Sequence, residues 1–89
     1  MSLDVELFFS PYCPHCRAAR EHVRAAISVL PENTVRYQER NVIEHLERAV
    51  ELGVKATPAI AVSGKLLPMI RWEKKALRTL LNSQIKKED

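Results

Sequence analysis

Residues 3–9 alternate between hydrophobic and polar positions, which is the pattern of a half-buried strand. The residues that share one face are Leu3, Val5, Leu7 and Phe9. Phe8 makes the opposite face partly apolar as well, as in a strand inside a sheet, although Glu6 is an unusual residue there. We therefore predict a central strand over residues 3–9.

From Cys16 onward the hydrophobic residues take a helical spacing. They are Ala19, Val23, Ala26, Ile27 and Leu30. Pro31 cannot continue a helix, so we predict that the helix stops there. The turn-rich segment SPYCP separates this helix from the strand before it, and the only two cysteines of the chain, Cys13 and Cys16, lie at this junction.

A second helix is predicted to start at the segment NVIE. Asn41 can cap the free backbone N–H groups, and Glu44 can reach back to complete a capping box. The apolar stripe of this helix consists of Ile43, Leu46 and Val50. Gly53 is a suitable residue to end it.

The other segments predict three strands and a last helix. Residues 34–39 and 59–62 each form a short strand, and the Ser-Gly pair after the latter turns the chain into a hairpin with residues 65–70. Pro68 confines that last strand to a sheet edge. Residues 73–85 carry a final apolar stripe at helical spacing.

The resulting order is β-α-β-α-β-β-α, which predicts an α/β fold with a four-stranded mixed sheet. The first two strands are expected to pair in parallel through a right-handed crossover, and the last two to pair antiparallel. A sheet of this kind is closed by helices on both faces.

Length and composition narrow the class of protein. The 89 residues predict a single domain over residues 1–89, with 46% hydrophobic and 28% charged residues, as in an ordinary globular protein. The formal charge of +3 is spread over several segments without an aromatic ladder, so we expect no nucleic-acid partner, and no apolar stretch is long enough for a membrane. The first residues carry no basic leader, so we expect a cytoplasmic protein, and we expect a monomer.

The two cysteines permit three kinds of chemistry. A structural zinc site needs four ligands, and His15, His22 and His45 have no ligand spacing to the cysteines, so a metal held by one chain is the less favoured possibility. A disulfide across two intervening residues closes a very small loop and is a poor staple.

Redox chemistry fits the spacing better, because Cys-x-x-Cys beside a β-α-β pattern is a sign of a redox-active dithiol. Cys13 is expected at or just before the first helical turn, where free N–H groups and the helix dipole stabilise a thiolate. It would be the nucleophile, and Cys16, one turn further on, would resolve the mixed disulfide. Pro14 suits an early helical position because its missing N–H would have had no partner.

The segments CPHC and GVKATPAIAVSGK together resemble the thioredoxin/glutaredoxin superfamily, in particular the small glutaredoxin-like thioredoxins. The resemblance spans nearly the whole chain and implies a thioredoxin-like three-layer α/β/α fold. It implies a thiol–disulfide oxidoreductase that acts on disulfide-containing proteins, with no bound cofactor other than the redox-active disulfide Cys13–Cys16. It also implies that Thr57–Pro58 is a cis pair packed opposite the cysteines, with the Thr57 backbone free to pair with an extended substrate.

Two departures from the superfamily pattern concern acid–base chemistry and glutathione. Thioredoxins carry a buried Asp six residues before the first motif cysteine, where this chain has Leu7. Glutaredoxins usually follow the cis-proline strand with Gly-Gly and an Asp that hold glutathione, where this chain has SGKLLPMI. Glutathione-dependent thioltransfer, with glutathione as co-substrate, therefore stays an alternative, as does a metal or iron–sulfur site built from the two cysteines. The electron donor would be an unidentified reductase or glutathione.

The neighbours of the cysteines suggest how their reactivity is set. Together with Pro14, His15 is expected to tune the pKa of Cys13, because an imidazole beside a thiolate stabilises it. Tyr12 could equally be a packing residue or a substrate contact at the rim. Arg17 and Arg20 are expected on a solvated face that adds positive potential, and Trp72 in the core.

Overall fold

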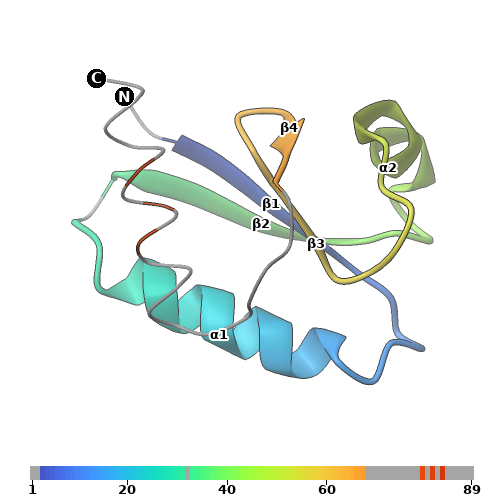
Figure 1. The fold of residues 1–89 in the computed structure, drawn as a ribbon, viewed down its shortest axis with the longest axis horizontal. Coiled ribbons are helices and arrows are strands. Elements are labelled where there is room, and N and C mark those ends of the chain that lie inside the picture. Colours follow the sequence, from blue (N-terminus) through green and yellow to red (C-terminus); the bar gives the residue numbers. More distant parts are fainter. Residues whose placement is uncertain (1–2, 32, 68–78, 80, 82, 84–89) are drawn as a thin grey trace.

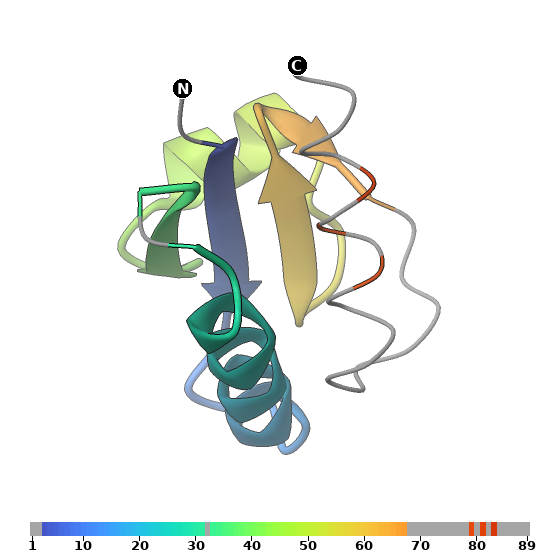
Figure 2. The ribbon, with the colours of Figure 1, turned by 90° about the vertical axis from the view of Figure 1, so that its left-hand side faces the viewer.

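Four strands form one mixed sheet between two helices in the computed structural model, which describes residues 3–31, 33–67, 79, 81 and 83. The strands and helices are β1 (Leu3–Phe9), α1 (Cys16–Ser28), β2 (Val35–Asn41), α2 (Leu46–Leu52), β3 (Ala59–Val62) and β4 (Lys65–Leu66). Figures 1 and 2 show α1 and α2 on opposite faces of the sheet. The predicted α/β architecture is therefore confirmed.

The strands lie in the order β2-β1-β3-β4, so β1 is central, as its apolar residues on both faces predicted. β1 and β2 are parallel, with Leu3 opposite Val35 and Phe9 opposite Asn41. β1 pairs antiparallel with β3, and β3 pairs antiparallel with β4, which confirms the predicted hairpin. Because β1 and β2 run in the same direction, both lead toward the end of the sheet where the cysteines lie.

The face under α1 holds the larger hydrophobic core. Its buried members are Leu3, Val5, Leu7, Val23, Ala26, Ile60, Val62 and Leu81. The alternation in residues 3–9 and the helical spacing after Cys16 correctly identified most of this set. The helix itself ends at Ser28, three residues before Pro31, after the last turn that packs on the sheet.

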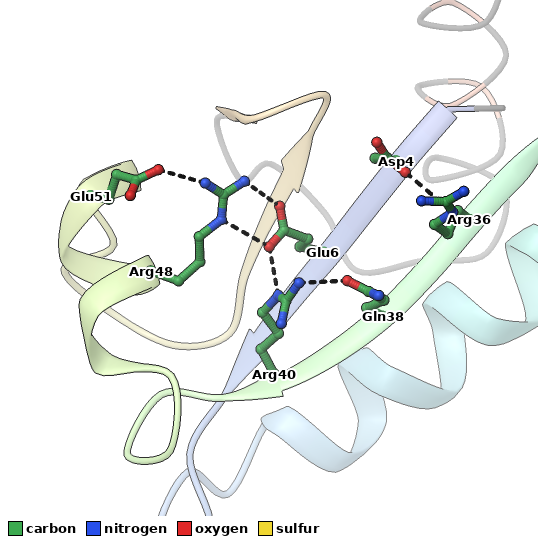
Figure 3. Close-up of polar contacts among 7 residues, drawn as sticks. All are labelled: Asp4, Glu6, Arg36, Gln38, Arg40, Arg48 and Glu51. Atoms are coloured by element: carbon green, nitrogen blue, oxygen red, sulfur yellow. Dashed lines mark hydrogen bonds and ion pairs between the residues drawn. The ribbon is translucent and has the colours of Figure 1, made fainter. Parts of the chain in front are cut away.

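The face under α2 is covered by smaller side chains and by charged residues. Its buried apolar members are Phe8, Ala49, Ala59 and Ala61. Glu6, the middle residue of β1, points to this face and is only 5% exposed. Figure 3 shows how its carboxylate is held: Arg40 Nε donates to Oε2 at 2.6 Å and Arg48 Nη2 donates to Oε1 at 2.9 Å. The buried carboxylate of Glu6 is thus paired with one arginine from β2 and one from α2.

The predicted start of the second helix is wrong. β2 extends to Asn41, and residues 42–45 form a turn before α2 begins at Leu46. Asn41 Oδ1 accepts a hydrogen bond from the Ile43 N–H at 2.8 Å, so it caps a turn rather than a helix, and no capping box with Glu44 forms. The strand is longer because Asn41 pairs with Phe9 of β1. Gly53 does end the helix, in a left-handed conformation with φ 85°.

The apolar stripe of the second helix lies on its solvent side. Ile43, Leu46 and Val50 are 60%, 61% and 69% exposed, respectively. Ala49 is the buried residue of α2, and Leu52 is packed beside it. A two-turn helix over a sheet face of alanines buries a small residue there, so the spacing of the larger residues did not identify the buried side.

The C-terminal expectations fall mostly outside the described residues. This applies to residues 68–70 of the predicted fourth strand, Pro68 among them, to Trp72, and to most of the helix predicted at residues 73–85. Leu67 is described and lies beyond the end of β4 at Leu66. Leu81 is described, and it is completely buried in the core beside α1. Among the described residues, no helix has the length and apolar character that crossing a bilayer requires.

Candidate active site

A turn at residues 10–15 joins β1 to α1 and places the two cysteines. The Cys13 N–H donates to the Ser10 carbonyl at 3.2 Å, and the Cys16 N–H donates to the Cys13 carbonyl at 3.4 Å. α1 begins at Cys16, so Cys13 precedes the helix, as predicted. Pro14 lies in the turn rather than at an early helical position, which corrects that expectation, because the helical N–H···O bonds start only with the Ala19 N–H to the His15 carbonyl.

The loop before β3 closes over Cys13. The Thr57–Pro58 peptide bond is cis, as the resemblance implied. The Cys13 Sγ donates to the Thr57 carbonyl oxygen at 3.6 Å, across 44 residues of sequence. The CPHC segment and the segment around Thr57–Pro58 therefore meet in one place, as the resemblance implied.

The pKa values of the two free thiols are shifted in opposite directions. Burial tends to raise the pKa of Cys13, but hydrogen bonds from the Cys16 thiol, the backbone N–H of His15 and the Thr57 side chain outweigh it, so the pKa lies below its usual value. The bond from the Cys13 thiol to the Thr57 carbonyl is available only to the protonated form, since a carbonyl can only accept. The donors named above favour the thiolate instead, and together they outweigh burial.

Cys16 has the reverse properties. It is 2% exposed, and burial together with its hydrogen bond to Cys13 raises the pKa of its thiol. The backbone at Ser10 acts in the opposite direction and does not compensate. A partly exposed thiol with a lowered pKa therefore stands beside a buried thiol with a raised pKa.

His15 and Tyr12 are both exposed residues of the turn. His15 is the residue before α1, and its side chain makes no capping hydrogen bond. Its backbone N–H, rather than its imidazole, is the group that contributes to the lowered pKa of Cys13. Tyr12 is 85% exposed, which excludes a core-packing role in the described part of the chain. The roles assigned to these two side chains stay predictions.

The arginines of α1 are not alike. Arg17 is exposed, with Glu21 at 3.6 Å, as predicted for a solvated face. The expectation for Arg20 is wrong: its Nη2 donates to Glu39 Oε1 at 3.0 Å, and its guanidinium lies 4.2 Å from the centre of the Phe9 ring. Glu39 also accepts from Arg24 and from the Tyr37 hydroxyl. Sequence reasoning missed this cluster, although Tyr37 and Glu39 are two residues apart and therefore share one face of β2.

The two departures noted in the sequence can now be located. Leu7 is completely buried in the core beside α1, so no carboxyl group lies at that position. Glu6, the neighbouring acid, points to the opposite face and is paired with Arg40 and Arg48. Among the described residues, no group of three or more His, Cys, Asp or Glu side chains is placed to hold a metal ion.

Comparisons with known proteins agree with this geometry. The model of a thioredoxin domain family matches residues 3–69. The chain is 40% identical over 62 residues to thioredoxin of Methanocaldococcus jannaschii, which covers 70% of this chain and 72% of the relative. It is 34% identical over 64 residues to a probable thioredoxin of Methanothermobacter thermautotrophicus, covering 72% and 74%.

Solved structures share the fold. Mitochondrial thioredoxin 3 of Saccharomyces cerevisiae superposes with a TM-score of 0.74 at 25% identity, over 92% of this chain and 78% of that one. The zinc-bound form of human ERp44 gives a TM-score of 0.80 at 16% identity, but this chain spans only about a quarter of its length, 27%. The chain belongs to the thioredoxin family and is a thiol–disulfide oxidoreductase.

Proposed function

We propose that the chain exchanges electrons between the Cys13–Cys16 dithiol and disulfides of other proteins. The observation that carries this proposal is the opposite acidity of the two thiols, with the pKa of the accessible Cys13 lowered and that of the buried Cys16 raised. A nucleophilic thiolate must be exposed to meet its substrate, and a resolving thiol must not react with solvent oxidants first.

The exchange conserves atoms and electrons in two steps. The Cys13 thiolate attacks one sulfur of the substrate disulfide, whose S–S bond breaks, and the departing sulfur leaves as a thiolate. Cys16 then loses its proton and attacks Cys13 Sγ, which releases the second substrate thiolate. The substrate gains two electrons and takes up two protons, while the protein is oxidised to the Cys13–Cys16 disulfide.

Three residues beside Cys13 are proposed to bind the substrate. Thr57 and Pro58 precede β3, and the Thr57 backbone already contacts Cys13. An extended substrate segment could pair with this backbone and bring its disulfide to the Cys13 sulfur. Tyr12, exposed one residue before Cys13, would form the rim of the same site.

Pro14 and His15 are proposed to set the acidity of Cys13. Pro14 shapes the turn that directs the His15 and Cys16 N–H groups at the sulfur. If the His15 imidazole adds to this, His15→Val raises the pKa of Cys13 and lowers the redox potential, because the thiolate exists only in the reduced protein. On the scale of a two-electron couple, about 30 mV corresponds to a tenfold change in the equilibrium.

The remaining expectations belong to the same proposal. They are a single domain over residues 1–89, a monomer, a cytoplasmic location, and electrons supplied by an unidentified reductase or by glutathione. The glutaredoxin alternative is disfavoured by the Ser63–Gly64 turn, where glutaredoxins usually have Gly-Gly followed by Asp. A metal or iron–sulfur site would need ligands beyond those that the described residues bring together.

Single-cysteine variants test the proposal. Cys13→Ser should abolish reduction of a protein disulfide such as that of insulin, whereas Cys16→Ser should accumulate a mixed disulfide, detected as a mass increase that dithiothreitol removes. Trapping by both variants, or only by Cys13→Ser, would contradict the roles assigned. Turnover that requires glutathione would favour the thioltransferase instead.

A further inference from the structure

We propose that the outer side of α2 is the docking surface for the protein that exchanges disulfides with Cys13, and that this partner presents apolar side chains bordered by Lys or Arg. The inference rests on the proposed function and specifies its partner. The surface, named the α2 patch, consists of Ile43, Leu46 and Val50.

The α2 patch is unusual because it exposes large aliphatic side chains to solvent, which favours a binding partner. Its three aliphatic side chains are between 60% and 69% exposed, while the same helix buries only Ala49. Leu46 and Val50 are one helical turn apart on α2, and Ile43 is exposed in the turn that leads into the helix. Single exposed aliphatic residues are common, but a row of them is typical of an interaction surface.

The α2 patch lies on the side of α2 that faces away from Arg48. Arg48 leaves α2 toward Glu6, the middle residue of β1, as Figure 3 shows. Leu46 and Val50 lie two residues before and two after Arg48, so at about 100° per residue both point about 160° away from it.

Both chain segments that flank α2 contact the site. On the N-terminal side, the Val42 N–H donates to the Phe9 carbonyl at 2.9 Å, immediately before the turn that holds Cys13. On the C-terminal side, the chain continues from Gly53 to Thr57, whose carbonyl accepts from Cys13 Sγ. A protein bound at Cys13 and Thr57 therefore meets chain segments that continue directly into α2.

The charge around the α2 patch selects the partner. Residues 43–52 contain Glu44, Glu47 and Glu51 but only one cation, Arg48, which is shared with Glu6. This segment is acidic although the whole chain carries +3. A partner with apolar side chains bordered by Lys or Arg matches both features, and opposite charge accelerates its encounter.

The test compares three disulfides reacting with the reduced protein. Two are cystine peptides of equal length with leucines beside the disulfide, flanked in one by lysines and in the other by glutamates. The third is bis(2-hydroxyethyl) disulfide, which is too small to reach the α2 patch. The variants are Leu46→Gln/Val50→Gln and Glu47→Lys, with Val29→Gln, a half-exposed valine at the end of α1, as the matched control.

At low salt, the wild type should reduce the lysine peptide about tenfold faster than the glutamate peptide. Leu46→Gln/Val50→Gln should lower the rate for the lysine peptide about tenfold, which corresponds to about 1.4 kcal/mol. Glu47→Lys, an exposed substitution, should narrow the difference between the two peptides even if the double variant folds poorly. Val29→Gln should change none of these rates.

The outcomes separate the two proposals. If none of the three disulfides is reduced, the proposed function itself fails. If bis(2-hydroxyethyl) disulfide is reduced but the peptides do not differ, or the variants leave the peptide rates unchanged, the docking surface is wrong and the proposed function stands. A wild-type dimer that Leu46→Gln/Val50→Gln dissociates in sedimentation would assign the α2 patch to a second copy and overturn the inference.

Discussion

Helices α1 and α2 are attached to the two faces of one sheet by different means. α1 is attached by apolar contacts, with Val23 and Ala26 completely buried against β1 and β3. α2 buries only Ala49, and its Arg48 reaches across the sheet to the carboxylate of Glu6. The difference shows that an ion pair can hold a helix on a sheet where few apolar contacts do. Leu46 and Val50 of α2 are therefore left exposed to solvent.

Removing the charge of Glu6 should have the largest effect on stability. Glu6→Gln keeps the shape of the side chain but leaves Arg40 without its anion and Arg48 with only the exposed Glu51, which should cost about 3 kcal/mol. The free energy of unfolding from urea denaturation measures it. The control is Asp4→Asn, because Asp4 and Arg36 form an exposed pair at 3.8 Å that should contribute less than about 1 kcal/mol. Equal effects of the two substitutions would mean that Glu6 does not anchor α2.

The same valine-to-alanine substitution in each helix sharpens the comparison. Val23→Ala removes two methyl groups from a completely buried position and should cost about 2 kcal/mol. Val50→Ala, at a position that is 69% exposed, should change the free energy of unfolding by less than about 0.5 kcal/mol. A loss at Val50 as large as that at Val23 would show that the α2 patch is covered within the monomer.

The helix ends should differ on a smaller scale. Gly53 ends α2 at φ 85°, where a side chain is disfavoured, so Gly53→Ala should cost about 1 kcal/mol. No neighbouring atom lies within 4 Å of the added Cβ, so the cost is conformational. Val29 ends α1 at φ −92°, and Val29→Ala should be nearly neutral in the same thermal unfolding measurement.

A pH that falls below the usual range of carboxyl pKa values should affect α2 before α1. Hydrogen bonds from Arg48 hold the pKa of Glu6 below its usual value, so its contribution to stability is complete above the unfolded-state pKa and is lost as the pH falls through the folded-state pKa. Hydrogen exchange at falling pH should therefore show amides of α2 losing protection earlier than those of α1. Glu6→Gln should abolish this order. Simultaneous loss in both helices of the wild type would assign the acid effect to Glu39, whose pKa is lowered as well, or to the whole chain.

Local patterns predicted much of the site. The alternation in residues 3–9 identified the central strand, and the spacing of Cys13 and Cys16 after it identified their chemistry. Gly53 marked a helix end because a left-handed residue is required there, which is a purely local demand. The acidity of Cys13 was expected from a position just before a helix, although the groups that lower its pKa include Thr57, far away in the sequence.

Long-range pairing explains what the sequence did not predict. Asn41 has the composition of a helix cap, yet it ends a strand because Phe9 lies beside it in the sheet. Arg20 has the spacing of a surface residue, yet it lies over the Phe9 ring and contacts Glu39. In each case a partner supplied by another element outweighs a local preference worth about 1 kcal/mol.

By itself, the sequence determined the order of the strands and helices over residues 3–66 and the residues of α1 that face inward at each turn, because these depend on spacing along the chain. It also led to the proposed redox pair, Cys13 and Cys16. Only the tertiary structure decided that Glu6 would be neutralised by Arg40 and Arg48 and that Leu46 and Val50 would face solvent. The physical reason is that burial depends on what lies opposite. Over the small side chains Ala59 and Ala61, a short helix anchored by a guanidinium packs closest through Ala49, whatever side its larger residues occupy.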